Sequence, residues 1–203
     1  MSYDLKQSLI LTEGTPVEIM DHTGTILFKT KAIIGKVSST TMSEINFEYS
    51  RKGLIIPNLD IRNGLILRKT VTGETFIIVA VFDEVINNTK QSTSIRLIQT
   101  NSWASIKGFT EIADDYGNII SDEVTKATKL PVHVSVANAR LMQFKPGLKE
   151  IVEYRIYAPH CEAEILDRVG LMINGGELNF KVESVDLLTF PGLVLLDVRT
   201  ETR

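Results

Sequence analysis

The side chains that could do chemistry are few in this sequence, and they are widely separated. The chain has one cysteine, Cys161, which directly follows His160. A thiol beside an imidazole can act as a nucleophile if the two side chains meet. Neighbouring residues of a strand point to opposite faces, so we interpret Cys161 as a structural residue. A single cysteine also excludes a disulfide within the chain.

The remaining candidates for metal binding or acid–base chemistry form no known pattern. His22, His133 and His160 are not spaced as metal ligands. Asp114 and Asp115 precede a glycine but no calcium-loop pattern follows, so we interpret them as turn residues. The sequence has neither a G-x-S-x-G elbow nor a phosphate-binding glycine loop. We therefore expect no enzyme, no metal and no cofactor; an acid pair assembled from different strands is the remaining catalytic alternative.

The composition predicts a folded protein that does not hold nucleic acid by bulk charge. Hydrophobic residues make up 43% and charged residues 23% of the chain, and the formal net charge is -3. The charges are spread along the whole sequence, which argues against a phosphate-binding surface. The first residues lack a signal-peptide pattern and no run is long enough for a membrane span, so we expect synthesis in the cytoplasm and no membrane partner.

Strand patterns cover most of the chain and determine how any functional residue is positioned. The segment DLKQSLIL predicts a short N-terminal helix or a docking arm. Segments rich in β-branched residues then flank glycine turns, as TPVEIM and TILFKTKAII do around Gly24, and GLILRK and ETFIIVAVF around Gly73. STSIRLIQT and VHVSV predict further strands, with a polar loop over residues 87–91 before the first of them. The sequence thus indicates an all-β protein.

Three anchors recur at a nearly constant offset, which predicts an internal repeat. Tyr49 matches Tyr154, the run from Gly64 matches the run from Gly170 (GLIL and GLMI), and the run from Phe76 matches the run from Phe180 (FIIV and FKVE). The segments SIRLIQ and GLVLLDVR close the two halves. We therefore expect two tandem small antiparallel β-barrel or sandwich units; one large sandwich with a chance similarity is the alternative.

The repeat divides the chain into three expected parts. Residues 1–101 form a first barrel with the N-terminal arm, residues 102–130 form a connecting hairpin or a linker, and residues 131–203 form a second barrel. Each barrel is long enough to bury a core without a disulfide or a metal.

Two groups of residues are candidates for contact with other subunits. The first comprises large aromatic residues that we expect in connections between strands, where they would bury area against a partner: Trp103, Phe109 and Phe190. The second comprises polar residues of the loop over 87–91: Asn87, Asn88 and Lys90. Phe76, Phe82 and Phe180 are expected in the cores. We also expect residues 102–124 to contact a neighbour or line a channel.

The second half resembles the head–tail connector proteins of long-tailed bacteriophages, in particular the small β-barrel stopper, or neck, proteins. The motifs are an aspartate-led turn (Asp167-Arg168-Val169), a glycine turn (Ile173-Asn174-Gly175), the strand FKVESVD, and Pro191-Gly192-Leu193 before the closing strand. The N-terminal run TPVEIMDHTGTILFKTKAIIGKVSS is similar to the opening of the same group. The resemblance covers about half the chain, and the doubled unit departs from the single-barrel stoppers.

This resemblance implies a structural virion protein that forms a ring of six copies at the head–tail interface. Its partners would be a portal or adaptor protein and a tail protein, and packaged DNA would pass without sequence-specific binding. Assembly would take place in the bacterial host cytoplasm. A tail terminator, tail-tube or baseplate ring component is an alternative of the same class. A module that binds single-stranded nucleic acid or carbohydrate is the alternative of another class.

Overall fold

The computed structural model describes residues 3–37, 48–57, 59–86, 88–113, 119–137, 152–173 and 175–201. These residues form one helix, α1 (Tyr3–Glu13), followed by strands that belong to two separate sheets. The helix confirms the predicted N-terminal element. Among the described residues, no helix combines the length and the apolar character needed to cross a bilayer.

The first sheet is a closed antiparallel barrel. Its strands follow the order β1-β2-β3-β6-β5-β4 around the barrel, and β4 pairs back with β1. The strand bounds are β1 Thr15–Met20, β2 Ile26–Lys36, β3 Ser50–Ile55, β4 Ile66–Lys69, β5 Thr75–Ile86 and β6 Thr89–Gln99. Its interior is filled by branched aliphatic residues around Phe76, which is 1% exposed.

The second sheet is also a closed antiparallel barrel. The order is β10-β11-β12-β9-β8-β7, and β10 pairs back with β7. The strand bounds are β7 Ser102–Ala113, β8 Ile119–Val136, β9 Tyr154–Pro159, β10 Arg168–Ile173, β11 Gly176–Asp186 and β12 Leu193–Thr200. Phe180 occupies this core together with aliphatic residues and Cys161, and the ring of Tyr154 meets Phe180 edge-on at 5.3 Å.

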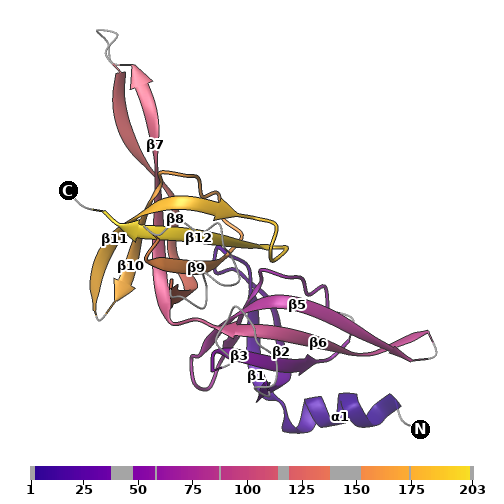
Figure 1. Ribbon diagram of the computed structural model, residues 1–203. Helices are drawn as coiled ribbons and strands as arrows, with labels where there is room; N and C mark the ends of the chain where they lie inside the picture. Colours follow the sequence, from indigo (N-terminus) through magenta and orange to yellow (C-terminus); the bar gives the residue numbers. More distant parts are fainter. Residues whose placement is uncertain are drawn as a thin grey trace. The chain divides into compact units, whose positions relative to one another are not determined.

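The two barrels have the same strand order. When the strands of each barrel are counted along the chain, both follow first, second, third, sixth, fifth and fourth around the ring. Figure 1 shows the first barrel in violet to magenta and the second in pink to yellow. The prediction of an all-β chain with two tandem barrels is therefore confirmed.

The equivalence of the two barrels extends to a single β-bulge. In β5 the register against β6 shifts between Ile78 and Ala80, and in β11 the register against β12 shifts between Val182 and Ser184. Each shift comes directly after the core residue that lies two positions beyond the buried phenylalanine, Ile78 after Phe76 and Val182 after Phe180. A bulge changes which residues point inward. Both strands consequently place their next core valine three residues further on.

The predicted glycine anchor identifies the correct pair of strands in the wrong register. Leu67 of β4 lies opposite Phe76, whereas Val169 of β10 lies opposite Phe180. Leu67 therefore corresponds to Val169 in the structure. The sequence alignment of GLIL with GLMI is shifted along the strand relative to this correspondence. The two glycines lie at different positions: Gly64 belongs to the turn before β4, whereas Gly170 lies within β10.

The expected boundaries of the units need correction. The chain divides into one unit of Met1–Thr100 with Leu188–Leu193 and another of Asn101–Leu187 with Val194–Arg203. Residues 102–130 do form a hairpin, but β7 and most of β8 in this segment are strands of the second barrel and do not connect two barrels. Without them the second barrel would lack two of its strands.

Two expectations about individual residues are also wrong. Phe82, expected in a core, follows the bulge in β5 and is 53% exposed. The expected polar loop over 87–91 is shorter, because Thr89, Lys90 and Gln91 already belong to β6. Phe76 and Phe180 are buried as predicted. The segment 138–150, whose sequence left a helical turn or a loop open, lies outside the described residues.

A buried ion pair lies beside the bulge of the second barrel. Arg155 of β9 donates from Nε and Nη2 to the two carboxylate oxygens of Asp197 in β12, at 2.6 and 2.9 Å. Ser184 Oγ donates to the same carboxylate at 2.8 Å. Arg155 is fully buried and Asp197 is 4% exposed. In the first barrel the position of Asp197 is taken by the exposed Arg96, which faces Ala80 after the bulge.

Replacing Asp197 by alanine should strongly destabilise the second barrel. The substitution leaves the Arg155 guanidinium buried without its carboxylate, which costs about 3–5 kcal/mol of unfolding free energy. Urea unfolding followed by the fluorescence of Trp103, the one tryptophan of the sequence, measures this loss because Trp103 lies on β7.

The matched control is Arg96→Ala, the corresponding position of the first barrel. This exposed residue should change the unfolding free energy, measured by circular dichroism, by about 0.5 kcal/mol or less. The double variant Arg155→Met/Asp197→Leu should recover most of the loss, since it removes both charges. An Asp197→Ala variant as stable as the wild type would show that the ion pair does not hold this barrel.

Candidate functional site

Two of the predicted contact residues share one face of one strand. Trp103 and Phe109 lie on β7, and not in connections between strands as expected. Ala104 and Ile106 of the same strand point into the core, so alternation places Trp103 and Phe109 on the outer face. Each of the two aromatic side chains is 48% exposed. The expected location in connections between strands is therefore wrong, and both side chains are exposed on the outer face of a strand.

The end of β7 and the beginning of β8 form a ribbon of two strands that leaves the barrel. The ladder between β7 and β10 ends at Lys107, and the ladder between β8 and β9 begins at His133. From the pair Gly108–Val124 to the pair Ala113–Ile119, β7 and β8 pair with each other and with no further described strand. Figure 1 shows this ribbon extending beyond the second barrel. Its length is roughly 20 Å for six residue pairs.

A network of charged side chains fixes the base of this ribbon. Arg168 at the start of β10 forms a two-point contact with Glu201, with N···O distances of 2.8 and 2.9 Å, and also donates to Glu123 of β8 at 2.9 Å. Lys107 binds the other oxygen of Glu123 at 2.9 Å. The Arg168 guanidinium lies 5.5 Å from the centre of the Phe109 ring. Residues of β7, β8 and β10 and of the segment after β12 thus hold the Arg168 guanidinium over the ring of Phe109.

The ionisation of this network follows from its hydrogen bonds. Hydrogen bonding to Glu201 raises the pKa of Arg168 above its ordinary value. The hydrogen bond from Lys107 lowers the pKa of Glu123 below its ordinary value of 4.5. Arg168 and Glu123 are therefore both charged at neutral pH, and they form an ion pair.

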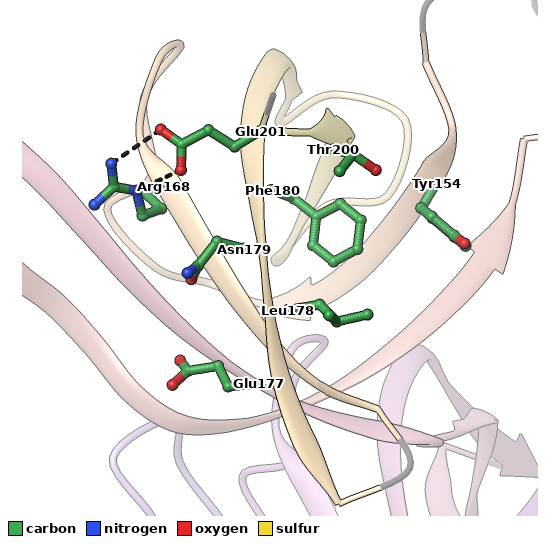
Figure 2. A pocket seen from close by; sticks show the side chains of 8 residues that line it. All are labelled: Tyr154, Arg168, Glu177, Leu178, Asn179, Phe180, Thr200 and Glu201. Atoms are coloured by element: carbon green, nitrogen blue, oxygen red, sulfur yellow. Dashed lines mark hydrogen bonds and ion pairs between the residues drawn. The ribbon is translucent and has the colours of Figure 1, made fainter. Parts of the chain in front are cut away.

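A pocket of about 420 Å³ lies next to the network on the second barrel. Figure 2 shows the Arg168–Glu201 pair on one side, Tyr154 on the other, and Phe180 between them. The lining residues come from β9, β10, β11 and β12 and from the residue after β12: Tyr154, Arg168, Glu177, Leu178, Asn179, Phe180, Thr200 and Glu201. Of the charged residues that line it, Arg168 and Glu201 pair with each other, and Glu177 accepts a hydrogen bond from Ser105 Oγ at 2.8 Å.

The remaining predicted contact residues lie elsewhere and do not join Trp103 and Phe109. Asn88 has a positive φ of 60° in the tight turn between β5 and β6, and Lys90 on β6 pairs with Asp83 at 2.8 Å. Asn87 lies outside the described residues. Phe190 lies in the loop between β11 and β12, where its carbonyl accepts the amide of Leu193 at 3.0 Å. The predicted set is therefore distributed over three places.

Cys161 belongs to the core of the second barrel. Burial raises the pKa of its thiol to about 12. The nearest charged groups are occupied with each other, since Asp167 accepts Lys126 Nζ at 3.0 Å and the amide of Glu164 at 2.8 Å. Gly108 leaves the space through which Lys126 passes, because a Cβ there would lie 2.4 Å from Lys126 Cε. This cluster fastens the segment before β10 to the hairpin.

The histidines take three different positions. His22 is exposed in the turn between β1 and β2, His133 is buried on β8 against the ring of Tyr157, and His160 is exposed after β9. Within the described ranges, no three His, Cys, Asp or Glu side chains are grouped so that they could hold a metal ion.

Arg168 and Glu201, which organise this site, are not recognisable as site residues from the sequence. Arg168 was noted only as part of the turn Asp167-Arg168-Val169, and Glu201 stands near the end of the sequence without a recognisable pattern. Their contact joins β10 to the end of β12, 33 residues later. The available signal was the arginine between two strand-forming segments, which the pattern alone does not connect to its carboxylates.

The thiol of Cys161 should react very slowly in the folded chain. At pH 8 a thiol of pKa about 12 is ionised about a thousandfold less than one with the ordinary value of 9.0, and only the thiolate is a good nucleophile. Alkylation by iodoacetamide, followed by mass spectrometry, should be about a thousandfold faster in urea than in buffer. Rapid alkylation of the folded chain would contradict the burial of this residue.

The Lys107–Glu123 contact should stabilise the base of the ribbon in a pH-dependent way. The folded pKa of Glu123 is lowered, so its contribution is complete above pH 4.5 and is lost as the pH falls through the folded value. Glu123→Gln should therefore lower the protection of ribbon amides against hydrogen exchange at pH 7, with the difference from wild type shrinking below pH 4.5.

The control for this prediction is Glu162→Gln, which removes one carboxylate of the second unit that forms no ion pair with any described residue. It should leave the exchange of the ribbon amides unchanged at both pH values. Equal protection in wild type and Glu123→Gln at pH 7 would show that the network does not order the ribbon.

Comparison with known proteins adds no further constraint on this site. No protein-family model matches the sequence, and no curated protein matches it at a significant level. The functional conclusion below rests on the barrels, on the ribbon and on the resemblance of the sequence motifs.

Proposed function

We propose that this chain is a structural virion protein of a tailed bacteriophage, and that its copies form a ring at the head–tail interface. In this role it is a stopper, or neck, connector that helps to retain packaged DNA and provides a docking face for the tail. Its neighbours are a portal or adaptor protein on the head side and a tail protein on the other side. The chain acts through assembly and performs no reaction.

The tandem pair of closed barrels with one strand order carries this proposal. A closed barrel pairs its strand edges internally, so its outer faces and loops are the surfaces available to neighbours. Each chain therefore brings two barrels of the same strand order to an assembly. Rings of this kind form when a head-to-tail contact has a rotation that closes.

The family motifs occupy places in the fold that suit this role. Asp167-Arg168-Val169 leads into β10, and Pro191-Gly192-Leu193 leads into β12, the closing strand of the second barrel. The exposed aromatic residues of β7 supply area for a subunit contact, as large rings do in protein interfaces. The net charge of -3 suits a channel through which DNA slides without being bound.

A binding module for single-stranded nucleic acid is the second candidate, and one observation favours it. Phe82 is exposed on β5 with the Arg96 guanidinium 5.9 Å from its ring centre. An exposed ring beside a cation can stack a base while the cation meets the phosphates. A tail terminator, tail-tube or baseplate ring component is the alternative within the structural class.

Negative-stain images and sedimentation of the purified chain test the proposal. We expect ring-shaped particles at micromolar concentration. Trp103→Ala and Phe190→Ala should reduce the fraction of chains in rings, because each removes an aromatic side chain of the expected contact surface. Far-UV circular dichroism should remain that of the wild type. Phe76→Ala, a core truncation, is the comparison that should instead lower the unfolding midpoint.

Three results would contradict the proposal or its details. A chain that stays monomeric under all conditions and shifts a single-stranded oligonucleotide in a salt-dependent way would favour the binding module. Rings that fail to bind any portal or tail preparation would argue against the head–tail position. Trp103→Ala and Phe190→Ala variants that assemble normally would remove these side chains from the contact.

A further inference from the structure

Among the described residues, three side-chain cations lie over aromatic rings. The pairs, with 5.3, 5.5 and 5.9 Å between cation and ring centre, are Lys69 with Phe76, Arg168 with Phe109 and Arg96 with Phe82. In the first two pairs the cation is neutralised, Lys69 by Glu74 at 2.7 Å and Arg168 by Glu201 at 2.8 Å. Arg96 forms no ion pair with a described carboxylate, and Phe82 beside it is 53% exposed. Of the three, this pair alone combines an unpaired cation with an exposed ring.

A second unpaired cation lies beside Arg96. Lys52 of β3 is directly opposed to Arg96 of β6, both side chains are exposed, and Lys52 also forms no ion pair with a described carboxylate. Like charges at opposed positions of a sheet repel each other. Glu84 of the neighbouring strand β5 does not relieve this repulsion, because Lys6 of α1 holds it at 2.6 Å. The two cations can therefore receive an anionic ligand.

Strand alternation places the ring and both cations on one outer face of the first barrel. Ile95 of β6 lies in the core and Val81 of β5 packs against it, so their neighbours Arg96 and Phe82 point outward. Lys52 shares this face because it is directly opposed to Arg96. The three strands are neighbours in the order β3-β6-β5 (Figure 1). We call Lys52, Arg96 and Phe82 the cationic face.

The surroundings of the cationic face allow a chain to approach closely. Along the row of opposed residues, Gly35 of β2 lies next to Lys52, and Ala80 of β5 lies next to Arg96. A Cβ at Gly35 would meet nothing within 4 Å. Small residues at both ends of the row leave no long side chain that would hold a ligand away from the two cations.

A phenyl ring, an arginine and a lysine on one face match the chemistry of a single-stranded nucleic acid. An unstacked base can stack on an exposed ring, and the adjoining phosphates can meet the two cations. A duplex keeps its bases inside the helix, so it offers phosphates to Lys52 and Arg96 but no base to Phe82. The combination therefore favours a single strand over a duplex.

We propose that the cationic face of the first barrel binds single-stranded nucleic acid, with a base on Phe82 and neighbouring phosphates on Arg96 and Lys52. This activity goes beyond the proposed ring function, because it belongs to one barrel and does not require copies to associate. It is also distinct from the passage of packaged DNA, since a duplex lacks the unstacked base that Phe82 receives. Single-stranded DNA and RNA share the recognised chemistry.

Fluorescence anisotropy of a labelled oligothymidylate of about ten nucleotides tests this inference. We expect a dissociation constant of about 10–100 μM at low salt, similar binding of an oligouridylate, and about tenfold weaker binding of a duplex of the same length. Two phosphate contacts predict that the logarithm of the binding constant falls with the logarithm of the salt concentration at a slope of about -1.4.

Substitutions separate the stacking contact from the phosphate contacts. Phe82→Ala should weaken binding about tenfold and leave the salt slope unchanged, because it removes a ring but no charge. Lys52→Gln and Arg96→Gln should each reduce the slope to about -0.7, because each removes one phosphate contact. Phe82→Trp should bind at least as tightly as the wild type, since its ring also stacks.

The second barrel supplies matched controls. Phe109→Ala removes an exposed ring whose arginine is already neutralised, and Lys129→Gln removes the charge of an exposed lysine of β8. Both variants should bind the oligonucleotide as the wild type does. Far-UV circular dichroism establishes that every variant is folded.

Four results would overturn the inference. They are no binding by the folded wild type at low salt, equal binding of single strand and duplex, cationic-face variants that bind as the wild type does, and competition by polyglutamate as effective as competition by an oligothymidylate of equal charge. The last result would assign the face to acidic peptides. Sedimentation velocity of the same samples without oligonucleotide measures ring formation separately, so a failure of the ring function remains distinguishable from a failure of this site.

Discussion

Pairing between the first and the fourth strand of each half closes the sheet and makes the remaining structure possible. Val17 to Met20 pair with Lys69 to Ile66 in the first barrel, and Ala104 to Lys107 pair with Leu171 to Arg168 in the second. These ladders are short, but they join residues that lie 46 to 52 positions apart in the first barrel and 61 to 67 positions apart in the second. Without them two edges would open in each half, and the apolar interior would have no enclosing wall.

Closure also determines where the two halves can differ. The interiors of both barrels contain aliphatic residues around one buried phenylalanine. The residues next to the bulge, in contrast, differ in charge and in burial between the two barrels. The second barrel buries Arg155 with Asp197, and the first barrel exposes Arg96 at the corresponding position. A buried ion pair requires both partners in one geometry. The same backbone thus supports a buried ion pair in one half and an exposed cation in the other.

The sequence was sufficient for the fold class and insufficient for the site. The phenylalanine anchors and the turns at Gly24 and Gly73 are local signals, and they identified the strands that they belong to. β8 was divided because Pro131 normally marks a strand boundary. Here β8 pairs with β9 only from His133 onward, so the missing amide of Pro131 breaks no ladder on that side.

The other differences from the prediction arise from contacts between distant segments. Phe82 points outward because the bulge after Ile78 changes the alternation, and a bulge leaves no clear mark in a single sequence. Arg168 meets Glu123 and Glu201, which lie 45 and 33 residues away along the chain.

The shared bulge has a consequence for the history of this chain. One extra residue at the same step of the same strand, in two barrels with one strand order, is more simply inherited than acquired twice. It indicates that a shorter ancestral gene encoded a single self-closing barrel and was later duplicated and fused. Each half then kept the geometry that closure demands, while its outer surface was free to diverge. One half now exposes Arg96 beside its bulge, and the other extends the hairpin of β7 and β8.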